Sequence, residues 1–328
     1  MIKLYIRNEY FLADYIMKIG NYTPNYIETA MNMEGTFDIH NKDASELKTD
    51  AKLIQMRRYG CNNARDSENN LVHQYEFVII PNFGFLASAD PLMKDCELKL
   101  SFDRSKGSIP LIDISTDADA DVIDGIEIID CVAITEWISS PGLRDYFSSI
   151  DNTPIVYQYE EIDVNVISLP TNRSNFRLEN VKGGNVPNYI FAGIIESEAL
   201  NGNKTLCPTK FERHNVEEFN IMINGSSCNG YPITIKNGSP TMAVYKLIET
   251  TNRLCNMSCG STPRYLEFIN NWLWSHKFEA EGTQGWISFT MKLSEAFATD
   301  KPMSMVIWTV SPCAITLDKF HQVEKLNP

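Results

Sequence analysis

The feature of this sequence that most constrains its fold is a series of short segments in which apolar side chains recur at every second residue. In residues 96–102, Cys96, Leu98, Leu100 and Phe102 alternate strictly with polar side chains. This period of two residues is that of a strand with one buried face. Asn-Gly and Gly-Gly pairs separate the later segments and supply the positive φ angles of tight reversals. The pattern predicts an all-β sandwich or jelly roll rather than alternating strands and helices.

Predicted strands run through most of the chain, and predicted helices are few. The strands are expected at residues 73–81, 96–102, 126–138, 155–167, 188–196, 218–224, 231–236, 272–279, 285–293, 303–310 and 314–323. Amphipathic periodicity predicts helices at residues 8–19, 240–255 and 263–271, as insertions between strands.

A polar stretch at residues 168–182 separates two strand-rich halves. The chain of 328 residues is long enough for two domains of ordinary size. We therefore expect a first β unit over residues 1–168, with a helical N-terminal part, and a second over residues 169–328.

Charge and hydropathy exclude several classes of protein. The formal net charge is −13, and the longest basic cluster is Arg57-Arg58, whereas nucleic-acid binding usually needs clustered Lys and Arg. Direct contact with nucleic acid is therefore not expected. No run approaches the roughly 18 apolar residues of a membrane span. Charged residues interrupt the apolar N-terminus, so no signal peptide is predicted and the protein is expected to fold inside the cell.

The residues that carry chemistry form no recognisable motif. The eight cysteines are scattered, and the one close pair, Cys255 and Cys259, lacks the second ligand pair of a zinc site, so free thiols are expected. Motifs for nucleotide binding, nucleophilic serine and zinc proteases are absent. We predict no catalytic, cofactor-binding or metal-binding residues, no cofactor, and a protein that is not an enzyme.

Two groups of residues admit a binding function as an alternative interpretation. Asp117, Asp119, Asp121 and Asp124 have the ligand density of a calcium loop, but Val122 and Ile128 stand where an EF-hand needs glycine and glutamate. A solvated acidic loop is the simpler interpretation. The five tryptophans could stack on sugars, but they lie in predicted strands and are expected to fill a core or an interface. They are Trp137, Trp272, Trp274, Trp286 and Trp308.

Around the predicted boundary, many short matches follow one another in a fixed order. Ser140-Pro141-Gly142 follows a strand, Leu169-Pro170 ends the next, GGNVPNYIFAGIIESEALNGN spans residues 183–203, and residues 219–224 precede Gly225. This order resembles the major capsid proteins of the Polinton (Maverick) and adintovirus lineage, with similar segments at residues 286–293, 302–309 and 315–319. Cys207 departs from the pattern, because the family has asparagine before the proline that corresponds to Pro208.

The resemblance covers roughly residues 75–323 and implies a double jelly roll. It implies a structural major capsid protein that self-assembles through pseudo-hexagonal homotrimers into an icosahedral virion shell. The partners would be neighbouring capsomers, penton and minor capsid proteins, and assembly would occur in the host cytoplasm or nucleus. Residues 237–271, the longest insertion, are where subunit contacts would lie.

Members of that family are usually longer, and only about four predicted strands precede residue 168, whereas a jelly roll has eight. The first roll would then be shortened, and a domesticated capsid relic that does not assemble is one alternative. A glycan-binding jelly-roll module is another. A β-sandwich enzyme is a third, and it would need His214 or His276 in a cleft against an acid.

Overall fold

The fold is described from a computed structural model. Its described residues are 154–235, 237–254, 272–279, 283–318, 320 and 322–326, together with the earlier stretches 2–6, 12–13, 15–16, 43–47, 61–65, 71–75, 84–87, 98–102, 130–132 and 138–142 and residues 92, 96 and 145. The predictions for Asp117–Asp124, Trp137, Cys255, Cys259 and residues 263–271 concern residues outside this part of the chain.

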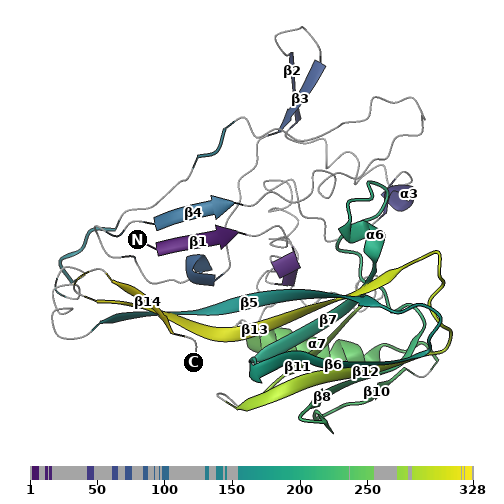
Figure 1. The fold of residues 1–328 in the computed structure, drawn as a ribbon. Helices are drawn as coiled ribbons and strands as arrows, with labels where there is room; N and C mark the ends of the chain where they lie inside the picture. Colours follow the sequence, from purple (N-terminus) through teal and green to yellow (C-terminus); the bar gives the residue numbers. More distant parts are fainter. Residues whose placement is uncertain are drawn as a thin grey trace.

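Two antiparallel sheets form a sandwich in the C-terminal half (Figure 1). In the first, β13 (Met303–Leu317) pairs on one side with β5 (Ile155–Leu169) and on the other with β7 (Tyr189–Glu196) and β14 (Val323–Leu326), and β7 pairs with β11 (Leu273–Lys277). The second has the order β10 (Ile233–Thr234), β8 (Val216–Ile223), β12 (Gln284–Leu293) and β6 (Asn175–Asn185), with β9 (Ser226–Ser227) beside β8.

The order of the eight main strands is that of a jelly roll. Consecutive strands lie in opposite sheets, except for β8 and β10, so that the four-stranded orders are β5-β13-β7-β11 and β6-β12-β8-β10. Connections from alternate strands therefore meet at the same end of the sandwich. Ser197 N–H bonds to Pro302 O at one end, and Val186 N–H bonds to Thr283 O at the other. The all-β jelly-roll class predicted from the sequence is confirmed.

The polar stretch at residues 168–182, where we expected the boundary between two β units, contains the greater part of a strand. This strand, β6, begins at Asn175 and pairs with β12. As the edge strand of its sheet, β6 buries Phe176 while Arg177 and Glu179 remain exposed, so its composition resembles that of a loop. The roll also includes β5, which the predicted division assigned to the first unit.

The predicted strands at residues 303–310 and 314–323 correspond to one long strand, β13, followed by the short β14. Pro312 lies between Val310, the last residue paired with β7, and Ala314, the first paired with β14. A proline is tolerated where a strand has no partner on one side, so β13 continues through it.

The described elements of the N-terminal half are short. The parallel pair β1 (Ile2–Ile6) and β4 (Leu98–Phe102) confirms the predicted strand at 96–102 over most of its length, and β2 (Cys61–Arg65) pairs with β3 (Leu71–Tyr75). Helix α3 (Ala44–Leu47) and the 3-10 turn η1 (Gly84–Ala87) complete them. A first jelly roll over residues 1–168 stays a prediction.

Two hydrophobic clusters lie along the β5–β13 pair. The larger fills the sandwich, where Phe219 stacks on Trp274 at a centroid distance of 4.5 Å. The smaller joins Phe85 of η1 to Tyr157 and Leu317, at the ends of β5 and β13 that extend toward β14 in Figure 1. These ends therefore connect the jelly roll to the N-terminal half.

The predicted helix at residues 240–255 is confirmed as α7 (Thr241–Leu254), in the connection between β10 and β11. It packs on β11 and buries Ala243, Val244 and Leu247. A second, one-turn helix, α6 (Ser197–Leu200), follows β7.

Candidate functional site

The outer face of the first sheet is covered by residues from the start of the chain. A sandwich strand usually buries one face and exposes the other. In β7, however, every residue from 189 to 195 is buried, and in β13 every residue from 303 to 310. Leu12, Tyr15 and Ile16 are each 1% exposed and belong to the same hydrophobic cluster as these strands.

Phe211 and Trp308 form the centre of this contact. Their rings lie 5.2 Å apart in an edge-on arrangement, and the ring of Tyr15 lies 5.4 Å from that of Phe211. The Trp308 indole N–H donates to the backbone oxygen of Leu12 at 2.8 Å. A Cβ at Gly193 would lie 2.7 Å from Phe211 Cδ1, so the absence of a side chain there lets the ring reach the sheet.

Lys210, the neighbour of Phe211, holds a second N-terminal segment through charge. Its Nζ lies 2.7 Å from Asp43 Oδ2 and from Glu46 Oε2, and 3.3 Å from Glu212 Oε1. Burial lowers the pKa of Lys210, but the hydrogen bonds to Asp43 and Glu46 and the charge of Glu212 outweigh it, so its pKa lies above the usual value. The ammonium is therefore a permanent cation within a ring of carboxylates.

Backbone hydrogen bonds fix the same segment. The N–H of Cys207 donates to Asp43 Oδ1 at 2.8 Å, and that of Ala44 donates to Thr205 O at 2.9 Å. The N–H of Asp43 in turn donates to Glu46 Oε2 at 3.0 Å, which is the reciprocal half of a capping box at the start of α3. The β7–β8 connection thus binds the N-terminal half through the backbone of Thr205 and Cys207 and through the side chains of Lys210 and Phe211.

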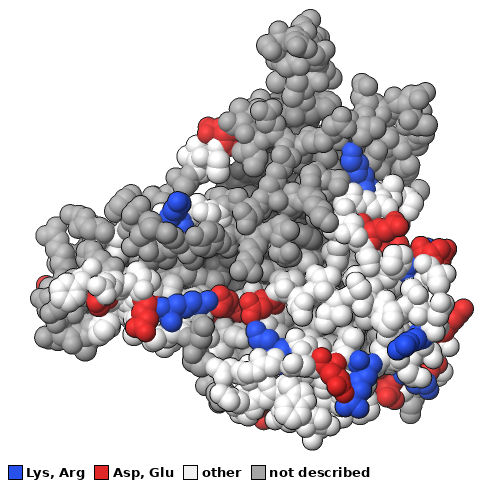
Figure 2. All heavy atoms as spheres, viewed as in Figure 1, with Lys and Arg blue, Asp and Glu red and all other residues white. Residues whose placement is uncertain are grey.

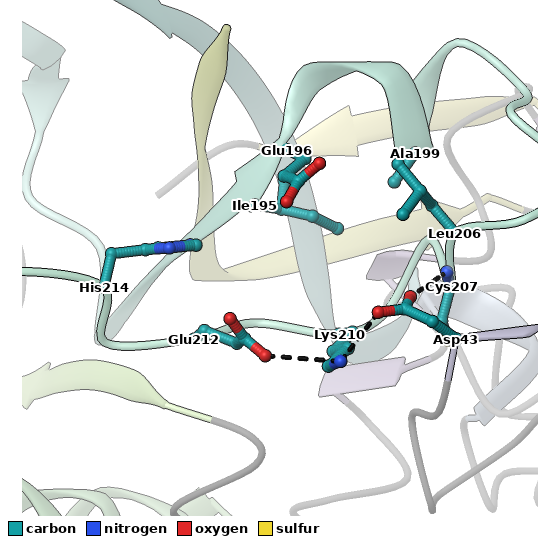
Figure 3. A pocket seen from close by; sticks show the side chains of 9 residues that line it. All are labelled: Asp43, Ile195, Glu196, Ala199, Leu206, Cys207, Lys210, Glu212 and His214. Carbon is teal, nitrogen blue, oxygen red and sulfur yellow. Dashed lines mark hydrogen bonds and ion pairs between the residues drawn. The ribbon is translucent and has the colours of Figure 1, made fainter. Parts of the chain in front are cut away.

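A pocket of about 200 Å³ opens beside this ion cluster (Figure 3). Glu196, Glu212 and His214 line it together with Asp43 and Lys210. Burial lowers the pKa of His214, against the opposing charges of Glu212 and Glu196. The structure thus brings one predicted candidate, His214, near acids, but its buried Nε2 has no hydrogen-bond partner within the described residues.

The other predicted candidate, His276, lies in the interior of the sandwich. It is 8% exposed on β11, and its ring meets Tyr231 and Phe278 edge-on. His276 is therefore packed among aromatic side chains.

The exposure of the tryptophan side chains bears on the sugar-binding alternative. Trp272, Trp274 and Trp308 are at most 2% exposed, whereas Trp286 is 51% exposed. A sugar-stacking platform needs clustered exposed aromatics, and three of the four described tryptophans fill the core instead. The described surface of α7 does present two apolar side chains, Met242 at 47% and Tyr245 at 56% exposure.

Charged side chains of both signs are interspersed over the described residues on the face in Figure 2, without one extended basic patch. Among the described cysteines, Cys131 and Cys228 are free thiols. Across the described ranges, no group of three or more His, Cys, Asp or Glu side chains could hold a metal ion. No helix within those ranges combines the length and apolar character needed to cross a membrane.

Sequence reasoning missed Asp43, Lys210 and Phe211. The spacing Asp43-x-x-Glu46 was a readable sign of a helix start. The alternation of Lys210, Phe211 and Glu212 gave no indication of which partners the three side chains would meet.

No family model and no curated protein matches the chain. The solved structures similar to it include a cryo-EM structure of the Sputnik virophage, with 13% identity and a TM-score of 0.37 over 53% of this chain and 39% of that one. They also include the PBCV-1 virus capsid (8% identity, TM-score 0.37, 58% of this chain and 55% of that one) and the mavirus major capsid protein (9% identity, TM-score 0.32, 58% of this chain and 44% of that one). The chain spans about half or less of the length of these proteins.

Proposed function

We propose that this protein is a structural capsid protein that assembles as homotrimers of pseudo-hexagonal outline into an icosahedral virion shell. The observation that carries the proposal is a complete jelly roll whose outer sheet face is buried by the N-terminal half of the same chain. Two units side by side are what the resemblance to Polinton-like double jelly-roll capsid proteins implies. The all-β core agrees with a role in assembly.

Assembly would use the ends of the sandwich. Three copies related by a threefold axis form a closed ring through heterologous interfaces, and lateral contacts between rings tile a shell. Obligate interfaces of this kind bury on the order of 2,000–5,000 Å². Helix α7, with Met242 and Tyr245 exposed in the longest insertion, is our candidate for part of the contact between copies.

Within a virion, the partners would be neighbouring capsomers together with penton and minor capsid proteins. The net charge of −13 opposes direct contact with nucleic acid, so other, basic proteins would hold the genome.

The test is the mass in solution, measured by multi-angle light scattering over a range of protein and salt concentrations. We expect a trimer of about three times the chain mass of 37.3 kDa, or larger shells. The double variant Met242→Ser/Tyr245→Ser should shift the mass toward the monomer, whereas Phe320→Ser, which changes a 71% exposed ring outside α7, should not. A native protein that stays monomeric at every concentration contradicts assembly.

A further inference from the structure

Helix α7 covers a buried group of titratable side chains that assembly does not explain. Lys246 lies on its inner face with only 7% of the side chain exposed, and its Nζ is paired with Glu249 Oε2 at 2.9 Å. Beneath the lysine, a Cβ at Gly230 would lie 2.5 Å from Lys246 Cε. The glycine therefore leaves the space that allows an ammonium to be buried here.

His276 lies on β11, the strand that α7 packs against. Its ring is edge-on to Tyr231 at 5.8 Å and to Phe278 at 4.9 Å, so aromatic edges surround it. Tyr231 uses its hydroxyl to donate to Ser275 O at 2.7 Å. The Nδ1 atom of His276 is buried and has no hydrogen-bond partner among the described side chains and backbone groups.

The charges around His276 disfavour a proton on it. Its pKa is lowered to about 4 by burial, with a further contribution from the charge of Lys246, and Glu249 opposes both. The other titratable groups nearby are neutral at neutral pH, because burial raises the pKa of Cys228 to about 11 and that of Tyr231 well above its usual value. Glu249 is therefore the one described anion near the ring, and Lys246 already pairs with it.

We propose that the contact between α7 and β11 is an acid-sensitive latch, in which protonation of the buried His276 releases the helix from the sandwich. An imidazolium in this position would be a buried cation whose Nδ1–H has no hydrogen-bond acceptor in the described structure, and the charge of Lys246 would oppose it. Opening of α7 exposes the imidazolium ring to water, which supplies hydrogen-bond acceptors and screens the repulsion from Lys246. The latch is independent of whether the protein assembles.

The direction of the pH effect follows from linkage. The pKa in the closed state, about 4, lies below the ordinary value of 6.5, so the open state binds more protons. Stability of the closed helix is complete above about pH 6.5 and is lost as the pH falls toward 4. Between pH 8 and pH 5, the opening equilibrium should rise about 30-fold.

The experiment is hydrogen–deuterium exchange of the full chain at pH 8 and pH 5, corrected for intrinsic exchange rates. We expect the protection of residues 241–254 to fall about 30-fold at pH 5, while that of β7 and β13 falls much less. In His276→Gln this pH dependence should disappear. The matched control His214→Gln removes the other histidine whose pKa burial lowers, and it should leave the α7 response intact.

Two results would overturn the latch. One is an unchanged pH response of α7 in folded His276→Gln. The other needs no variant: in the native protein, the His276 imidazole signals followed by NMR would titrate near pH 6.5 while α7 keeps its protection. An NMR pKa well below 5, reached only as α7 loses protection, is the expected outcome.

Discussion

The contact that joins the two halves of the chain can be tested by truncating Phe211 to alanine. The side chain is 0% exposed, and its ring lies between Tyr15, Trp308 and the open position at Gly193. Alanine would leave a cavity at the point where the N-terminal segment meets the sheet. Relaxation cannot fill it easily, because β13 and β7 are fixed by pairing on both sides.

The expected loss follows from this burial. Phe→Ala in a core costs about 3–5 kcal/mol, which includes both the transfer of the ring and the cavity. The value for Phe211 should lie near the middle, about 4 kcal/mol, because two aromatic contacts are lost and no polar group is left unpaired. Phe211→Leu, which retains much of the side-chain volume, should cost about 1–2 kcal/mol. It tests the same contact if Phe211→Ala does not fold.

The assay is urea unfolding followed by tryptophan fluorescence, since Trp308 contacts the mutated ring. Phe320→Ala is the matched control: its ring is 71% exposed, and its loss should be within about 0.5 kcal/mol. A loss below about 1 kcal/mol for Phe211→Ala would refute the packing of residues 12–16 on this face, because removing a ring that is exposed to water has little effect on the free energy of unfolding.

Two further predictions concern charge. Lys210→Met leaves a ring of carboxylates without its cation and should lower the free energy of unfolding by about 2 kcal/mol in the same assay. The control Lys292→Met, at a 58% exposed lysine, should change it by less than about 0.5 kcal/mol, and equal losses would contradict the role of Lys210 in the ion cluster. Burial raises the pKa of Glu160, which lies opposite Pro312, from 4.5 to about 7. The folded state therefore binds this proton more tightly than the unfolded state, and the contribution of Glu160 to stability falls as the pH rises from 4.5 to 7. Glu160→Gln should therefore be more stable than the native protein at pH 8 but not at pH 4.5 in parallel thermal melts, and a gain of the same size at both values would contradict the shift.

Most of the jelly roll could be predicted from the sequence because its strands carry local patterns. Residues 285–293 and 218–224 coincide with β12 and β8 to within two residues, and α7 follows from an amphipathic period. The strand β6 could not be predicted in this way, since an edge strand with a solvated face has the composition of a loop. The contacts of Lys210 join positions 164 and 167 residues apart, and no local pattern indicates such partners.

We did not predict from the sequence that the first sheet is covered, although the strand β7 (YIFAGIIE) carries apolar residues on both of its faces. A strand of an isolated antiparallel sandwich alternates polar and apolar residues, whereas an uninterrupted apolar strand indicates burial on both faces. Phe191 and Trp308 face the same side of adjacent strands, and Gly193 keeps that side open for Phe211. Without Leu12 and Tyr15 this aromatic face would meet water, so the jelly roll and the N-terminal segment stabilise one another. The unit that folds therefore includes both ends of the chain, and any assembly must use surfaces that remain after this face is covered.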